Sequence, residues 1–276
     1  MVIRVDVLPR LPRRPRDGHK GTFGTVLVLA GSQGMLGAAI LCARGALRGG
    51  AGLVRAVLPV ELMASFTIAV PPATTLDRAG TQAETACHAA DALVVGPGLG
   101  DGDTTRALLG RWLPAATAIP VVLDADALNA LAPLRGPQRL SNCILTPHPG
   151  EAARLLGTTT DVVQRDREGS ARELQARSGA VVVLKGAGTV ITDGERLAVN
   201  RSGNPGLATG GSGDVLTGLL GALCAQGMEP FDAARLAVHV HGEAGDLVAS
   251  RLSQAGLCAD DLPLAIAEVL RGFEDA

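Results

Sequence analysis

The chain has 276 residues, of which 47% are hydrophobic and 19% charged, and 25 basic against 27 acidic side chains leave a formal net charge of −2. Because binding to a nucleic-acid backbone depends on a strong basic field, this balance argues against a nucleic-acid partner. Glycine is in excess, with 36 residues, whereas aromatic side chains are 2% of the chain and tyrosine is absent. Glycine without a fixed period, in a chain that keeps its aliphatic residues, indicates a folded protein rather than collagen or disorder.

The first 17 residues form a basic N-terminal arm that we expect to be loose, and residues 18–276 form one domain because no linker divides them. The arm lacks the apolar segment of a secretory signal, and glycines and polar residues interrupt the uncharged run 21–43. The five cysteines form no CxxC pair, which favours free thiols in a reducing compartment. We therefore expect a cytoplasmic protein without a membrane-spanning segment.

Short apolar runs recur along the chain, with helical patterns between most of them. Continuous rather than alternating hydrophobicity, in a chain that alternates strand with helix, predicts a mainly parallel sheet covered on both faces. The predicted fold class is therefore α/β. The predicted parallel strands are 25–30, 53–58, 92–95, 121–123, 143–146 and 181–184, and one helix is expected to begin near residue 36.

After residue 184 the pattern changes. Two short β-like runs, 189–192 and 197–200, flank Asp193-Gly194, a pair typical of a tight turn, so we predict a hairpin. From Ser212 onward the pattern is helical. Helices are expected over about 212–226, 230–250 and 260–271.

Ligands of open α/β sheets bind beyond the carboxyl ends of the strands, so the residues after each apolar run are where a site is expected. Five of these segments are rich in glycine, proline or polar residues: 31–34, 96–100, 124–129, 146–151 and 185–189. We predict that these five strand ends meet at one rim.

The strongest single signal is the segment 204–214, Asn-Pro-Gly-Leu-Ala-Thr-Gly-Gly-Ser-Gly-Asp, which directly precedes an apolar helix. Its glycines leave the N–H groups at the helix start unobstructed, and the helix dipole adds positive charge, so the segment can bind phosphate oxygens. A carboxylate beside a phosphate would repel it. Asp214 therefore makes better sense as a base directed at a neighbouring hydroxyl, although an acid that only stabilises the helix dipole is the plain alternative.

Four further residues carry more than one interpretation. Lys185 could bring a cation to a polyphosphate or be an ordinary solvated strand end, and no GxxxxGK[ST] motif makes a P-loop of the chain. His148 lies between two prolines that fix its direction, and it either lines a ligand pocket or has a structural role. Asp124 and Asp126 could hold Mg²⁺ through water, bond a ligand hydroxyl, or only form a turn and a helix N-cap.

Two other motifs are weak. The glycines at 31, 34 and 37 follow a strand but do not make GxGxxG, and no acidic residue ends the next strand, so a Rossmann site is a poor fit. His239, His241 and Glu243 do not form HExxH, so a zinc site is equally weak.

Six segments in this order resemble the NAD(P)H-hydrate dehydratase family, the carbohydrate-kinase-like module of the ribokinase-like fold. The Thr-Pro-His-Pro-Gly-Glu segment narrows the likeness to this family, and the likeness runs from about residue 18 to about residue 272. It implies a three-layer α/β/α architecture with a mainly parallel central sheet in a single domain. The six segments are 19–24, 96–100, 123–129, 146–151, 185–189 and 210–214.

The resemblance implies a repair lyase that dehydrates the S epimer of NADHX or NADPHX to NADH or NADPH through a phosphorylated intermediate. The reaction would consume ADP or ATP and release AMP or ADP and phosphate; the stand-alone microbial members favour ADP. Mg²⁺ is the expected cofactor, with unknown ligands. A separate epimerase chain would supply the S form, and the family suggests a homotetramer.

The family's site residues carry over by matching position. The hydrate would contact Ala38 or Ala39, Gly100, His148 and Asp214, with Asp214 as the base. The nucleotide would be bound by Lys185, Gly186, Ala187, Gly188, Thr189, Asn204, Gly210, Gly211, Ser212 and Gly213. Two alternatives stay open at this point: a vitamin or sugar kinase of the same fold, and a non-catalytic nucleotide sensor.

Overall fold

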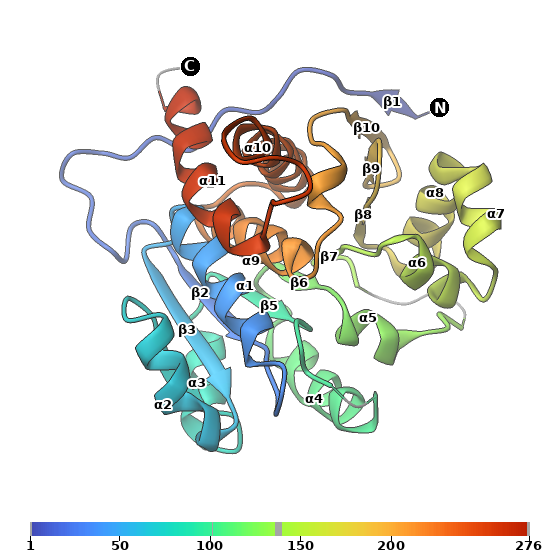
Figure 1. Cartoon of the computed structure of the whole chain (residues 1–276). Coiled ribbons are helices and arrows are strands. Elements are labelled where there is room, and N and C mark those ends of the chain that lie inside the picture. The colour runs from blue at the N-terminus through green and yellow to red at the C-terminus, as the bar shows by residue number, and fades with distance from the viewer. Residues whose placement is uncertain (1, 101, 136–139, 275–276) are drawn as a thin grey trace.

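The computed structural model describes residues 2–100, 102–135 and 140–274, and its strands join into one ten-stranded sheet (Figure 1). The strands lie side by side in the order β1-β10-β9-β8-β7-β6-β5-β2-β3-β4. Their bounds are β1 Ile3–Arg4, β2 Thr25–Leu29, β3 Leu53–Leu58, β4 Thr74–Asp77, β5 Ala92–Val95, β6 Val121–Leu123, β7 Cys143–Leu145, β8 Val181–Leu184, β9 Thr189–Thr192 and β10 Arg196–Asn200.

The pairing confirms both the mainly parallel sheet and the predicted hairpin. Every neighbour pair from β4 to β8 is parallel, whereas β9 is antiparallel to both β8 and β10. Two edge strands were missed, β1 and β4. The sequence of β4, Thr-Thr-Leu-Asp, has no apolar run because an edge strand is covered on fewer sides than a central one.

Helices cover both faces of the sheet and make three layers (Figure 1). In β2 the side chains alternate: Val26 and Val28 belong to one apolar core, and Leu27 and Leu29 to the other. The first core is closed mainly by α1, α2, α9, α10 and α11, and the second by α3 to α8. The helix bounds are α1 Leu36–Arg48, α2 Val60–Ala69, α3 Thr81–His88, α4 Gly102–Ala115, α5 Asp126–Leu131, α6 Pro149–Leu156, α7 Thr160–Arg165, α8 Arg167–Ser178, α9 Ser212–Ala225, α10 Pro230–Arg251 and α11 Leu262–Leu270.

Glycines let α1 and α9 touch backbone to backbone. A Cβ on Gly218 of α9 would lie 1.9 Å from the carbonyl oxygen of Cys42 in α1, and a Cβ on Gly45 of α1 would lie 2.3 Å from that of Val215 in α9. Neither position tolerates a side chain, because real Cβ atoms do not approach this closely. Part of the glycine excess therefore serves helix packing, which fixes where α9 begins relative to the sheet.

The N-terminal arm is not loose, which corrects the expectation from its composition. Its strand β1 pairs in parallel with β10, and Figure 1 shows the arm running from there past α10 and α11. Arg235 of α10 donates to the carbonyl of Val7. Arg14 lies over the ring of Phe23, 3.8 Å from its centroid, and donates to the carbonyl of Gly50 at 2.8 Å. Basic residues thus tie the arm to the domain through carbonyls and an aromatic face, which composition alone does not reveal.

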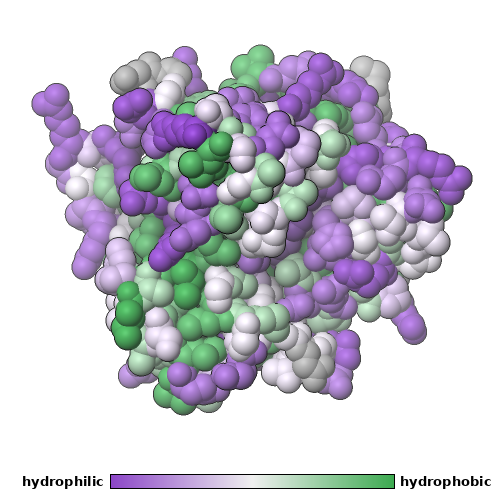
Figure 2. All heavy atoms as spheres, viewed as in Figure 1, coloured by the Kyte–Doolittle hydropathy of each residue, from purple (hydrophilic) through white to green (hydrophobic). Residues whose placement is uncertain are grey.

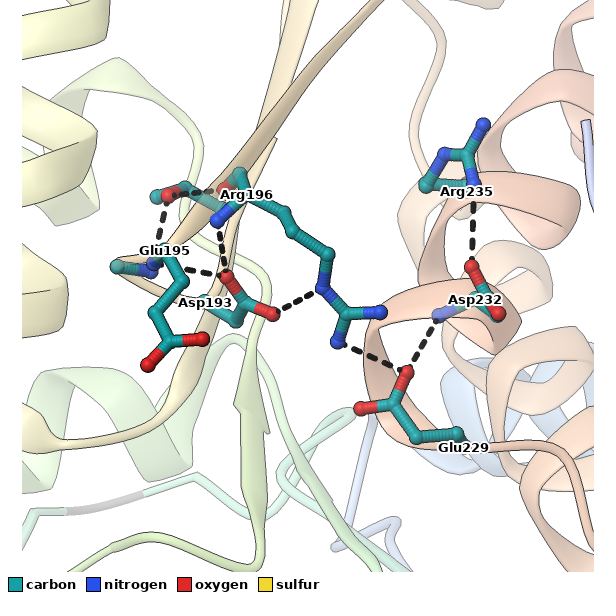
Figure 3. Close-up of polar contacts among 8 residues, drawn as sticks. Asp193, Glu195, Arg196, Glu229, Asp232 and Arg235 are labelled. Carbon is teal, nitrogen blue, oxygen red and sulfur yellow. Dashed lines mark hydrogen bonds and ion pairs between the residues drawn. The ribbon is translucent and has the colours of Figure 1, made fainter. Parts of the chain in front are cut away.

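The hairpin of β9 and β10 is tied to the start of α10 by a cluster of charged side chains (Figure 3). Asp193 accepts from the backbone N–H of Arg196 and from its Nε, both at 2.6 Å. The same guanidinium reaches Glu229, the N-cap of α10, at 3.2 Å. Within α10, Arg235 pairs with Asp232 at 3.0 Å. This cluster lies at the end of the sheet opposite the carboxyl ends of the parallel strands.

Most helices bury an apolar face, but α2 leaves one in solvent. Val60, Ala64 and Ile68 recur at every fourth position and are all exposed, with Val60 at 64% and Ile68 at 81%. Figure 2 shows apolar side chains gathered over this part of the surface. Within the described ranges no helix is both long and apolar enough to cross a membrane. All five cysteines are free, and Cys258 is the exposed one.

Candidate functional site

The five predicted strand ends meet at one rim of the sheet. Their strands, β8, β7, β6, β5 and β2, are consecutive neighbours in the sheet and run in the same direction. Backbone hydrogen bonds join the segments beyond them: Gly31 N–H donates to the Pro97 carbonyl at 2.8 Å, and Lys185 N–H to the Pro147 carbonyl at 2.8 Å. The prediction of a single rim is confirmed.

The glycine-rich turn opens α9 at this rim. Gly211 is the N-cap of α9 with a φ of +91°, and a Cβ there would lie 2.4 Å from Leu41 of α1, so only glycine fits. No side chain caps this helix start. The Ser212 N–H donates to the Thr209 carbonyl at 3.4 Å, so the N–H groups of Gly213 and Asp214 are the ones of this turn that can meet a ligand, and the helix dipole favours an anionic one.

Asp214 lies in that first turn and is half-buried. The pKa of its carboxyl is raised to about 7, first by burial and then by the negative charge of Asp124, whereas the Lys185 ammonium opposes the rise. The carboxyls of Asp126 and Glu151 add smaller upward contributions. A carboxyl with a pKa near neutrality is suited to accept a proton, which favours the base over the helix-dipole alternative.

Lys185 is not a solvated strand end. Its ammonium is 2.7 Å from Oδ1 of Asp124, and its side chain is only 19% exposed. A Cβ on Gly213 would lie 3.3 Å from the Lys185 Nζ, so the ammonium lies directly at the glycine turn. Asp124, in turn, does not cap α5, because Ala125 is the N-cap of that helix and no side chain caps it. The sequence left the roles of Lys185 and Asp124 undecided, and the structure shows that the two side chains form an ion pair.

The turn between β8 and β9 is shaped by a residue that the sequence did not single out. Arg167, the first residue of α8, donates to the carbonyls of Leu184, Lys185 and Gly188 at 3.0, 3.2 and 3.4 Å. Thr189 donates to the carbonyl of Gly186 at 3.0 Å, which closes the turn from the other side. Arg167 is in no motif and is brought here only by the packing of α8, so no sequence signal marked it. The turn's own residues, including the exposed Ala187, stay predicted nucleotide contacts.

The loop before the glycine turn is also held by its own side chains. Asn204 accepts from the N–H of Gly206 at 2.9 Å and donates to Asp246 of α10 at 2.9 Å. The second oxygen of Asp246 accepts from the N–H of Gly203 at 2.8 Å. The amide of Asn204 therefore shapes the loop, and Asp246 is a second residue that sequence reasoning missed.

His241, which the sequence hardly supported as a zinc ligand, connects two helices at the site. Its Nε2 is 3.0 Å from the Ser212 carbonyl and 3.3 Å from the Ser212 hydroxyl, so it joins α10 to the first residue of α9. Burial lowers the pKa of His241 to about 4, so the ring is neutral at physiological pH. The Ser212 side chain is buried against this ring. Ser212 stays a predicted nucleotide contact, because its hydroxyl, its carbonyl and its N–H all have partners within the protein.

The predicted hydrate contacts lie on the other side of the rim. A Cβ on Gly100 would meet Ser32 at 3.1 Å, and the Gly100 N–H donates to Asp126 at 2.8 Å, which fixes this turn. Ala38 adjoins the same turn at Gly98, where an added Cβ would lie 2.9 Å from the Ala38 side chain, and Ala38 is partly exposed. Ala39 is fully buried in the core. Of the two alanines, only the side chain of Ala38 is therefore open to a bound molecule.

The structural role of His148 is confirmed, and its place in a ligand pocket stays a prediction. It is the N-cap of α6: its Nδ1 accepts from the Gly150 N–H at 3.0 Å, and its own N–H donates to Glu151 at 2.8 Å. The ring is nevertheless 52% exposed at the rim. The cap fixes the direction of a ring that remains accessible.

No three His, Cys, Asp or Glu side chains within the described ranges lie close enough together to hold a metal ion. In this part of the chain, phosphate oxygens and water are therefore the expected source of most Mg²⁺ ligands. A cavity of about 740 Å³ lies elsewhere, between the arm, β10 and α10, and its lining contains none of the predicted nucleotide or hydrate contacts.

Comparison with solved structures confirms the ribokinase-like architecture. The ADP/ATP-dependent NAD(P)H-hydrate dehydratase of Bacillus subtilis, co-crystallized with ATP and Mg²⁺, superposes with a TM-score of 0.84 at 34% identity, covering 96% of this chain and 95% of that one. A ribokinase-like superfamily protein of Enterococcus faecalis, at 24% identity and a TM-score of 0.88 over 97% and 93% of the two chains, shares the fold.

Sequence comparison gives the family. The model of a family described as NAD(P)H-hydrate dehydratase matches residues 26–267. The ADP-dependent (S)-NAD(P)H-hydrate dehydratase of Neisseria meningitidis is 45% identical over 255 residues, which are 90% of this chain and 86% of that protein. The bifunctional NAD(P)H-hydrate repair enzyme Nnr of Coxiella burnetii is 43% identical over 93% of this chain and 52% of its own length, so the chain spans about half of that relative. The chain belongs to the NAD(P)H-hydrate dehydratase family.

Proposed function

We propose that this chain dehydrates the S epimer of NADHX or NADPHX to NADH or NADPH at the expense of ADP. The observation that carries the proposal is Asp214, a half-buried carboxyl whose pKa is raised to about 7, in the first turn of a helix that no side chain caps. The Lys185 ammonium lies beside the same turn. A base thus adjoins a phosphate site, which is what phosphoryl transfer to a hydroxyl requires.

In the first step Asp214 takes the proton of the ring hydroxyl while that oxygen attacks the terminal phosphorus of ADP. The new O–P bond forms as the bridging O–P bond to AMP breaks, and AMP departs. In the second step the carbon–oxygen bond breaks, phosphate leaves with the bonding pair, and the ring nitrogen lone pair drives the departure. Loss of a ring proton then completes the double bond of NADH or NADPH.

The binding surfaces follow from the same rim. The turns 185–189 and 204–213 would hold ADP, while Ala38, Gly100 and His148 would hold the hydrate, with Asp214 between the two sets. Since the chain has no tyrosine and one tryptophan, the adenine and nicotinamide rings would lie against aliphatic side chains and backbone rather than in aromatic stacks. The names of the Neisseria and Bacillus relatives support the same pair of substrates.

Further predictions on metal, partner, assembly and location belong to this proposal. Mg²⁺ would arrive bound to the nucleotide phosphates, because the protein offers no chelating cluster in its described part. An epimerase is the partner activity that the reaction needs, since only the S epimer is used. A homotetramer in the cytoplasm is the expected state, and the exposed apolar stripe of α2 is a surface on which copies of the chain could meet.

The test is direct. The purified protein is incubated with the hydrate and ADP, and recovery of reduced nicotinamide is followed by its near-ultraviolet absorbance while AMP and phosphate are measured. We expect one AMP and one phosphate for each nicotinamide recovered. Absence of recovery with both ADP and ATP would reject the dehydratase, and a stable phosphorylated product in place of phosphate would indicate a kinase.

A further inference from the structure

Asp124, at the end of β6, is a carboxylate that the proposed reaction does not use. It is 1% exposed, yet both of its oxygens are engaged. Oδ1 is 2.7 Å from the Lys185 ammonium, and Oδ2 accepts from the Thr217 hydroxyl at 2.7 Å. Asp124 thus touches the residue that follows β8 and one residue of α9, and both lie next to the predicted phosphate contacts.

We propose that Asp124 is a positioning residue, which holds the Lys185 ammonium at the glycine turn so that this cation meets the phosphates of the nucleotide. The inference rests on the proposed function, because it assumes that a nucleoside diphosphate binds at this turn.

The geometry leaves no simpler use for Asp124. Its side chain does not cap α5, and no group of three ligating side chains in the described ranges makes it part of a metal site. Ala125, with a φ of +49°, separates two acids that point to different partners: Asp124 to Lys185 and Thr217, and Asp126 to the Gly100 N–H. A non-glycine residue in this conformation is under strain, and such strain persists only where the surroundings enforce it.

The hydroxyl of Thr217 ties the pair to the helix start. It lies 2.9 Å from the Gly213 carbonyl as well as 2.7 Å from Asp124, and its single proton can be donated to only one of them at a time. The charged carboxylate is the stronger acceptor. The pair therefore fixes Lys185 relative to Gly213, where a Cβ would lie 3.3 Å from Nζ and 3.8 Å from the carboxylate.

Charge explains why the ammonium persists in a buried place. Burial alone would lower the pKa of Lys185, but Asp124, with smaller contributions from Glu151 and Asp214, raises it above its ordinary value. The groups that face Asp214 are Asp124 from β6, Lys185 from β8, Asp126 from α5 and Glu151 from α6. Burial raises the pKa of the Cys42 thiol in α1 well above its ordinary value, with smaller upward contributions from Asp214 and Asp124, so this thiol stays neutral. Among the charged neighbours, Asp124 therefore has the largest effect on the pKa of Lys185 and on that of Asp214.

The decisive experiment compares the binding of ADP and adenosine by calorimetry in Asp124→Asn and in the unmodified protein. Asparagine keeps the size and the hydrogen bond to Thr217 but removes the charge that holds Lys185. We expect ADP to bind about 10- to 100-fold more weakly and adenosine to bind unchanged, because only ADP has phosphates for the cation to meet. Equal weakening of both ligands, or of neither, would overturn the proposal.

Thr217→Val keeps the ion pair and loses only the tie to the helix start, so it serves as a milder second variant if Asp124→Asn does not fold. It should weaken ADP binding a few-fold, again without an effect on adenosine. Lys185→Met should reproduce the loss of ADP binding, and adding Asp124→Asn to it should cause little further loss. Two independent, multiplying losses would contradict a shared role.

A pH profile separates positioning from a general structural defect. With the charge of Asp124 gone, Asp214 loses its proton more readily, so the acid limb of kcat/KM should move to lower pH in Asp124→Asn. An unmoved limb would count against the proposal. If the unmodified protein bound ADP no more tightly than adenosine, the proposed function itself would be rejected. If Asp124→Asn kept the full preference for ADP over adenosine, only the role of Asp124 would be rejected.

Discussion

The molecule has charged clusters at both ends of its sheet, and they behave differently. At the carboxyl end, Asp124 and Lys185 have side-chain exposures of 2% and 19%. At the other end, Arg196 is 35% exposed and its partner Glu229 51%. Because water screens the second cluster, its charges mainly shape a turn, whereas both members of the buried pair act on the pKa of the neighbouring Asp214. The same pairing of charges therefore has the stronger effect on a neighbouring carboxyl where solvent is excluded.

The largest effect is expected at the carboxyl end, for Asp214→Asn. Since the amide cannot take up the hydroxyl proton, kcat should fall by about 10²- to 10⁴-fold. ADP should bind at least as tightly, because the variant removes a negative charge near the phosphates. Turnover assays and calorimetry check the two expectations. A loss of less than tenfold in kcat would show that another group is the base.

The second expectation concerns pH. Asp214 must be unprotonated to act, and its pKa is about 7. As the pH falls below 7, kcat/KM should therefore decrease by about tenfold per pH unit, and it should level off above 7. Rates measured from pH 5 to pH 9 with ADP in excess check this. A flat profile between pH 5 and pH 7 would mean that the carboxyl ionises as an ordinary exposed acid does.

The third expectation concerns stability at the same end. His241→Leu leaves the Ser212 carbonyl without its donor, which should cost about 1–3 kcal/mol in the free energy of unfolding. Thermal or urea unfolding measures the loss. His239→Leu is the control, because its ring lies on the same helix but makes an edge-on contact with Phe273 instead of a bond to α9. Comparable losses in both variants would argue against a special role for His241.

His241 also gives stability a pH dependence of known sign. Its pKa is about 4 when folded and about 6.5 when unfolded, so the unfolded chain binds the proton more readily. The contribution of the neutral ring is complete above pH 6.5 and is lost as the pH falls toward 4, by about 3 kcal/mol in all. Asp214, whose folded pKa is raised, works in the opposite direction. The difference in stability between the unmodified protein and His241→Leu should therefore shrink as the pH falls across this range.

The smallest effect is expected at the opposite end, for Arg196→Met. Methionine keeps an apolar stem over Phe231 and loses the partly exposed bonds to Asp193 and Glu229 (Figure 3). Stability should change by about 1 kcal/mol or less, and kcat should not change. Unfolding and turnover assays check both. A large loss of activity would mean that the exposed cluster influences the site at the carboxyl end of the sheet, contrary to this expectation.

Much of the fold could be predicted because it depends on local patterns. The central parallel strands are buried on both faces, so they appear as continuous apolar runs, and β3, β5, β6, β8 and β9 begin and end at the predicted residues. The edge strands β1 and β4 lack such runs and were missed. The looseness expected of the arm was wrong, because β1 pairs with β10 and the Gly50 carbonyl and the Phe23 ring hold Arg14.

By itself, the sequence determined the α/β class, the rim of strand ends and the glycine turn before Asp214, since each depends on residues that are close in the chain. Only the tertiary structure decided what the charged residues at that rim do. Asp124 lies 61 residues from Lys185 and 93 from Thr217, and His241 lies 29 from Ser212. Burial and partners set a side chain's charge state and task, and both depend on elements that meet only in the folded chain.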